Sequence, residues 1–181
     1  MEIQTPKPWL FSLIRYFLGS VFIVSGFSKL LPLKDFVQQA LAYKIPIPED
    51  ALYYLSVFLI AIEVWVGLSI LLNCNLRVSL LGAQILLIGM IPITIWGSLN
   101  QAPTCGCYGN LIKREPWQAT VEDCLLLAVS FMLLPCSKSK CKTSAFATIK
   151  SIVTLLITIG ALVYGIIQIQ NIIPSPIDKL I

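Results

Sequence analysis

The sequence contains no histidine and few charged residues. Its 181 residues include 13 Lys and Arg and 9 Asp and Glu, so charged side chains make up only 12% of the chain, against about 25% in soluble proteins. Without histidine the chain cannot build a His-ligated haem, a His-containing zinc site, or a Ser-His or Cys-His catalytic pair. The net charge of +4 is small and scattered, which excludes a nucleic-acid-binding surface.

Hydrophobic residues, by contrast, make up 57% of the chain. A soluble protein of this size could not bury so much apolar surface, so lipid is the expected solvent for much of it. Membrane-spanning helices of about 20 residues each leave no room for an extramembrane domain. The composition therefore predicts an all-α, polytopic membrane helix bundle that forms a single membrane domain over residues 1–181, with the lipid bilayer as its main partner.

Apolar runs divide the sequence into five predicted spans, at about residues 9–31, 51–72, 76–96, 117–135 and 145–169. The first run is longer than the apolar region of a signal peptide and contains Arg15, so we expect a transmembrane helix there. Glu122 and Asp123 make the fourth run the weakest. Between the first two spans, apolar residues recur at helical spacing over residues 34–44, which predicts a short helix that caps the bundle or lies in the membrane interface.

Arg15 and Glu63 are the charges that lie clearly inside the first two spans. Counted from the expected cytoplasmic ends of their spans, their depths differ by only about 5 Å at the α-helical rise of 1.5 Å per residue. A charge buried in lipid needs a partner. The sequence therefore predicts an intramembrane ion pair between Arg15 and Glu63, which either locks the bundle or lines a polar pocket.

The basic residues give the expected orientation. The two sides of the membrane carry similar totals, but four lysines cluster in one loop and at the start of the last span: Lys138, Lys140, Lys142 and Lys150. This cluster places that loop in the cytoplasm. The N-terminus is then cytoplasmic, and the loop between the third and fourth spans is extracytoplasmic.

That extracytoplasmic loop contains the triplet Cys105-Gly106-Cys107. The glycine gives the backbone the freedom that a tight ring needs, so the two sulfurs can approach each other. A disulfide in so small a ring would be strained, and strained disulfides are the ones that exchange readily. The triplet therefore predicts a thiol–disulfide exchange pair.

Three further residues bear on this chemistry. Lys113 and Arg114 follow the triplet and would favour the thiolate form of a nearby cysteine. Cys124 lies one or two turns into the fourth span, where the N-terminal end of the helix dipole also favours thiolate. Cys124 is therefore a candidate third, resolving thiol.

Other uses of the cysteines stay open. Any pairing of Cys105, Cys107 and Cys124 could be a static disulfide that fastens the loop to the bundle, whereas a structural zinc would lack a fourth ligand. A quinone-coupled enzyme of the vitamin K epoxide reductase or DsbB type would carry a Cys-x-x-Cys, which this chain lacks. We therefore expect no cofactor, and a quinone stays an open alternative that the sequence does not support. The remaining cysteines are expected on the reducing side as thiols: Cys74, Cys136 and Cys141.

The sequence resembles the DoxX and MauE membrane families over about residues 9–135. The resemblance is carried by several groups of residues: Arg15, Leu18-Gly19, Ser25-Gly26, Lys29-Leu30, Asp35-Phe36, Tyr43, Glu63 with Gly67, Cys105-Gly-Cys-Tyr-Gly109, Pro116-Trp117-Gln118, and Asp123 before Leu125-Leu126-Leu127. The loop is similar to that of the redox-associated MauE branch, with Tyr108 in place of the usual Phe. The last span, about residues 145–170, lies outside the resemblance.

The resemblance implies a four-helix DoxX-like core, to which this chain adds a fifth C-terminal transmembrane helix. It also implies a prokaryotic inner-membrane protein that works with a thioredoxin-like extracytoplasmic partner in the maturation of other proteins. The exchanging residues would be Cys105 and Cys107. The alternative is a non-catalytic assembly factor or accessory subunit whose loop cysteines are structural.

Overall fold

The computed structural model describes residues 8–44, 46–100, 115–135 and 145–172. These residues form six α-helices: α1 (Pro8–Leu30), α2 (Leu33–Leu41), α3 (Glu49–Leu72), α4 (Leu76–Leu99), α5 (Pro116–Leu133) and α6 (Ala145–Ile172). No strand occurs in these ranges. The predicted all-α fold is confirmed, and α2 coincides with the short helix expected after the first span.

Four of the described helices, α1, α3, α4 and α6, are long and apolar enough to cross a membrane. Their apolar stretches are 22 to 25 residues long, which matches a hydrocarbon core of about 30 Å at 1.5 Å per residue. The fourth predicted span, α5, is not among them: it is shorter, with 18 residues, and Glu122 and Asp123 lower its hydropathy. It nevertheless packs along α4 and contacts α1. The structure is that of a polytopic helix bundle.

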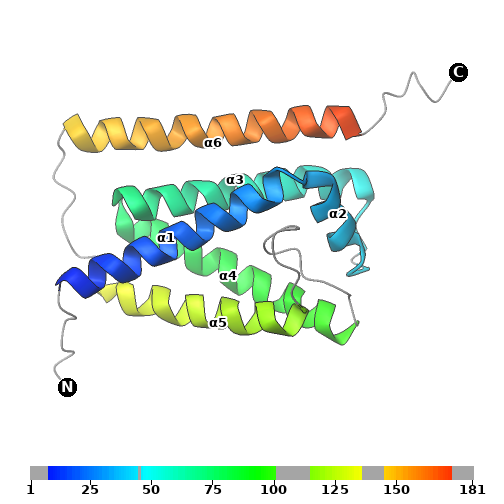
Figure 1. Ribbon diagram of the computed structural model, residues 1–181, viewed down its shortest axis with the longest axis horizontal. Helices are drawn as coiled ribbons and strands as arrows, with labels where there is room; N and C mark the ends of the chain where they lie inside the picture. The colour runs from blue at the N-terminus through cyan, green and yellow to red at the C-terminus, as the bar shows by residue number, and fades with distance from the viewer. Residues whose placement is uncertain (1–7, 45, 101–114, 136–144, 173–181) are drawn as a thin grey trace, which may run out of the picture.

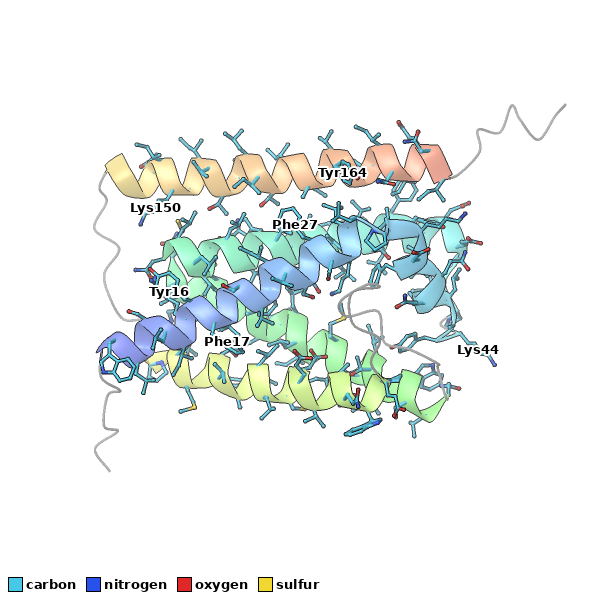
Figure 2. All side chains as sticks on the ribbon, in the orientation of Figure 1. Tyr16, Phe17, Phe27, Lys44, Lys150 and Tyr164 are labelled. Atoms are coloured by element: carbon cyan, nitrogen blue, oxygen red, sulfur yellow. The ribbon has the colours of Figure 1, made fainter. Side chains whose placement is uncertain are left out.

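The helices form layers (Figure 1). α1 crosses α3 in the middle of the molecule, α4 and α5 pack together on one side, and α6 lies along α3 on the other. The short helix α2 contacts α1, α3 and α6 at the end of the bundle opposite to the start of α1. Apolar residues such as Phe17, Phe27 and Tyr164 are exposed on the outer surface (Figure 2), as expected for a bundle whose outer surface contacts lipid.

Two glycines allow α1 and α3 to approach closely. A Cβ atom on Gly67 would lie 2.9 Å from the backbone oxygen of Gly19, and one on Gly19 would lie 3.1 Å from the backbone oxygen of Gly67. Small residues at such a crossing let two helix backbones come together in a membrane. The crossing also fixes the register of the two helices, and so decides which polar residues of α1 lie level with Glu63.

Buried apolar side chains form two clusters. One joins α1, α3, α4 and α5, around Leu18, Val66 and Leu80. The other joins the end of α1 with α2, α3 and α6, and includes Leu33 and Val37 on the inner face of α2. Of the two roles expected for the short helix, α2 performs the first: it caps the bundle.

The topology predicts opposite locations for the two segments on either side of α5. The end of α4 and the start of α5 lie at the same end of the bundle as α2, whereas the end of α5 and the start of α6 lie at the other end (Figure 1). The lysine cluster at residues 138–150 predicts a cytoplasmic location for that segment. We therefore expect reporter fusions after Asn110 to read extracytoplasmic and fusions within residues 138–142 to read cytoplasmic. The reverse pattern would place Cys105 and Cys107 in a reducing compartment.

The α1–α3 crossing predicts a strong cost for adding one methyl group. Gly67→Ala places its Cβ against backbone atoms of Gly19 and Ile23, which cannot move out of the way as a flexible side chain could. We expect a loss of about 1–3 kcal/mol, seen as a lower thermal unfolding temperature in detergent. Gly160→Ala in α6 is the matched control, because its Cβ would meet no atom within 4 Å. Equal stability of the two variants would contradict the crossing.

Candidate functional site

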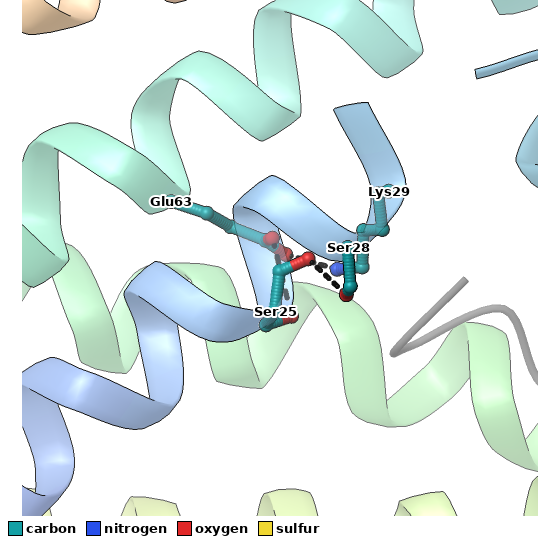
Figure 3. Close-up of polar contacts among 4 residues, drawn as sticks. All are labelled: Ser25, Ser28, Lys29 and Glu63. Atoms are coloured by element: carbon teal, nitrogen blue, oxygen red, sulfur yellow. Dashed lines mark hydrogen bonds and ion pairs between the residues drawn. The ribbon is translucent and has the colours of Figure 1, made fainter. Parts of the chain in front are cut away.

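A buried ion pair joins α1 to α3. The Nζ atom of Lys29 lies 2.5 Å from Oε1 of Glu63, and the two side chains are only 5% and 6% exposed. The hydroxyl of Ser25 donates a hydrogen bond of 3.4 Å to the other carboxylate oxygen of Glu63 (Figure 3). Charges removed from water are tolerated when they are paired and hydrogen-bonded. The pair therefore allows two charged residues to lie within the bundle.

The structure corrects the predicted partner of Glu63, which is Lys29 and not Arg15. The prediction counted depth from the ends of the two spans and so assumed that these ends are level. The register is set instead by the crossing at Gly19 and Gly67. Arg15 lies 14 residues before Lys29, about 21 Å away along the helix.

Arg15 has a different environment. Its guanidinium group lies 4.8 Å from the centroid of the neighbouring Tyr16 ring, an arrangement typical of a cation–π contact. Its Nε atom is buried and has no hydrogen-bond partner among the described residues. One sequence signal could have identified Lys29 as the partner of Glu63. Lys29 lies four residues after Ser25, and residues four apart share one helix face, so both side chains reach the Glu63 carboxylate.

The Lys29–Glu63 pair lines a small pocket between α1, α3, α4 and α5. Its other polar lining residues are Ser25 of α1 and the two carboxylates of α5, Glu122 and Asp123. The cavity volume is about 40 Å³, enough for a few water molecules. The two acids that make α5 a poor membrane span therefore face the inside of the bundle, where they are half-buried.

The predicted cysteine site is only partly described. Cys105 and Cys107 lie in residues 101–114, outside the described ranges. Cys124 is on α5, exposed, and shares the outward face of that helix with Val121 and Leu125. It does not line the pocket. Its eight-residue separation from Pro116 corresponds to about 12 Å along the helix, so its thiol lies away from the start of α5.

Side-chain hydrogen bonds hold the start of α5 in place. A capping box opens α5: the backbone N–H of Glu115 donates to Oε1 of Gln118, and the Glu115 side chain accepts from the backbone of Gln118. The indole N–H of Trp117 donates to Glu115 over 2.6 Å. One turn further, the hydroxyl oxygens of Thr120 and Thr94 are 2.9 Å apart and join α5 to α4.

A double-mutant cycle tests the ion pair. Lys29→Met strands the carboxylate of Glu63, and Glu63→Leu strands the ammonium group of Lys29, so we expect each to cost about 3–5 kcal/mol. The double variant should recover part of the loss, with a coupling energy of about 0.5–3 kcal/mol in thermal unfolding measurements.

Arg15→Leu provides the matched control for this cycle. Arg15 lies about 21 Å along α1 from Lys29, the partner of Glu63, so the losses of Arg15→Leu and Glu63→Leu should simply add. Additive losses for Lys29 and Glu63 would show that the two residues do not stabilise the bundle as a pair.

Comparison with known proteins identifies the family. A family model described as methylamine utilisation protein MauE matches residues 7–136, which include α1 to α5 but not α6. Protein TlpB of Flavobacterium psychrophilum is 30% identical over 147 residues, which cover 75% of this chain and 40% of TlpB. The chain thus spans about two fifths of the length of that curated relative. No solved structure matches. The resemblance expected from the sequence is confirmed: the chain belongs to the MauE family.

Proposed function

We propose that this chain supports thiol–disulfide exchange outside the cytoplasm through Cys105 and Cys107, with a thioredoxin-like protein as its partner in the maturation of other proteins. The observation that carries the proposal is the Cys105-Gly106-Cys107 triplet within the part of the chain that belongs to the MauE family. The triplet lies in the connection between α4 and α5. A cytoplasmic N-terminus in a prokaryotic inner membrane would place this connection on the oxidising side.

The proposed reaction is a two-step exchange. The thiolate of one loop cysteine attacks a disulfide of the partner, which forms a mixed disulfide and releases one partner thiolate. The second loop cysteine then attacks the sulfur of the first, and the other partner thiolate leaves. The loop is oxidised by two electrons and the partner is reduced by two. The same steps in reverse transfer a disulfide from the loop to the partner.

The described residues favour Cys105 and Cys107 over a pair that includes Cys124. The side chain of Cys124 lies on the outward, apolar face of α5. Its position about 12 Å along the helix from the start of α5 also separates it from the loop that enters there. The proposal keeps Cys124 as a candidate third thiol, and the Cys124→Ser variant below tests whether it takes part in the exchange.

Removal of the resolving thiol should trap the partner. We expect Cys107→Ser, with Cys105 as nucleophile, to accumulate a covalent adduct with a protein the size of a thioredoxin domain, which non-reducing electrophoresis detects and reductant removes. Cys105→Ser is the mirror variant, because either sulfur of so short a ring could attack.

Three further variants complete this experiment. Cys136→Ser and Cys141→Ser should trap nothing, since these residues are predicted on the reducing side. Cys124→Ser should trap a partner only if Cys124 is the resolving thiol. If neither loop variant traps a protein, and Cys105 and Cys107 stay oxidised in mild reductant, the loop disulfide is structural and the chain is an accessory subunit.

A further inference from the structure

We propose that Tyr43, Trp96 and Gly97 form a clamp that positions the cysteine loop for attack on a protein partner. The clamp joins the segment after α2 to the last turn of α4, which leads into the loop. The inference rests on the proposed exchange function, and it assigns to α2 a role beyond closing the end of the bundle.

The first part of the clamp is a ring packed on a glycine. The Tyr43 side chain is 5% exposed, and a Cβ atom on Gly97 would overlap Cδ1 and Cε1 of the Tyr43 ring. The ring therefore occupies the space that any side chain at position 97 would need. Only glycine allows this contact, because it has no Cβ.

The second part is a hydrogen bond between the same two segments. The indole N–H of Trp96 donates to the backbone oxygen of Tyr43 over 3.1 Å. That oxygen lies beyond the end of α2, and Lys44, the next residue, has a left-handed backbone with φ of 53°. Because the chain has left α2 at this point, the Tyr43 carbonyl can accept the hydrogen bond from Trp96 of α4.

The clamp is itself anchored in the bundle. Leu33 and Val37 hold α2 in the buried cluster that it shares with α3 and α6, so Tyr43 is tied to that cluster. On the other side, the amide group of Asn100 donates to the backbone oxygen of Trp96 over 2.9 Å and closes the end of α4. The position of this end therefore depends on α2.

The clamp and the capping box hold the two ends of the same connection. Gly97 is eight residues before Cys105, and Glu115 begins the capping box at the other end. Attack on a protein disulfide requires the loop and the partner to meet in one orientation, and small errors in placement cost large factors in rate. A small dithiol needs no such orientation. The clamp should therefore affect reaction with a protein but not with a small molecule.

The test compares two reductants on the purified, oxidised full chain in detergent. Reduction of Cys105 and Cys107 is timed with reduced thioredoxin and with dithiothreitol. For Gly97→Ala we expect at least a tenfold lower rate with thioredoxin and a rate within twofold of wild type with dithiothreitol. Gly89→Ala is the matched control on the same helix, because its Cβ would meet nothing within 4 Å, and both of its rates should equal those of wild type.

Trp96→Phe tests the clamp without adding an atom near Tyr43. It removes the indole N–H donor and keeps an aromatic, though smaller, ring. Because Trp96 is 52% exposed, the fold should persist even if Gly97→Ala fails to fold. We expect a several-fold lower rate with thioredoxin and no change with dithiothreitol.

The other outcomes overturn distinct claims. If both rates stay unchanged in Gly97→Ala and Trp96→Phe, the clamp does not position the loop, and the exchange function stands. If both rates fall by the same factor, the variants alter the disulfide itself and not its orientation, which also overturns the clamp. A wild-type loop that neither reductant can reduce would overturn the exchange function and, with it, this inference.

Discussion

The arrangement of the bundle depends on one requirement: the charge of Glu63, within an apolar span, must be paired. Lys29 meets this requirement from α1, and both side chains are almost fully buried. The pairing is possible because Gly19 and Gly67 let α1 and α3 approach backbone to backbone. An ion pair in low dielectric is costly to break, so it stabilises the register that the glycine crossing sets.

The register of α1 and α3 also decides which polar residues line the pocket between α1, α3, α4 and α5. α5 turns Glu122 and Asp123 toward the same pocket that Lys29 and Glu63 line. The outer surface of the bundle, by contrast, is rich in exposed apolar side chains, as the bilayer requires. The polar interior is small and its lysine is paired with Glu63, so we assign the proposed chemistry to the cysteine connection between α4 and α5.

Much of the fold could be predicted from the sequence, because hydropathy and helix length are properties of continuous segments. The helices were predicted in this way, and so was the weakness of α5, whose two acids lower its hydropathy. The partner of Glu63 could not be predicted, because depth along a span does not give the register between two spans. That register depends on contacts between glycines 48 residues apart in the sequence.

The packing of Tyr43 on Gly97 was likewise hidden from the sequence. A tyrosine after a short helix and a glycine near the end of another carry no local pattern that joins them. The Cys105-Gly106-Cys107 triplet could be recognised because its chemistry depends on the spacing within three residues. Its structure lies outside the described ranges, so its role rests on this spacing and on the family.

The reduction potential of the Cys105–Cys107 couple tests the central claim most directly. It can be measured by equilibrating the membrane-embedded protein in a series of dithiol redox buffers and alkylating the free thiols for mass spectrometry. Structural disulfides have potentials below about −300 mV, whereas strained, exchanging ones are less negative. The account predicts a reversible couple above about −300 mV. A disulfide that stays oxidised below that potential, or two thiols that never pair, would contradict it.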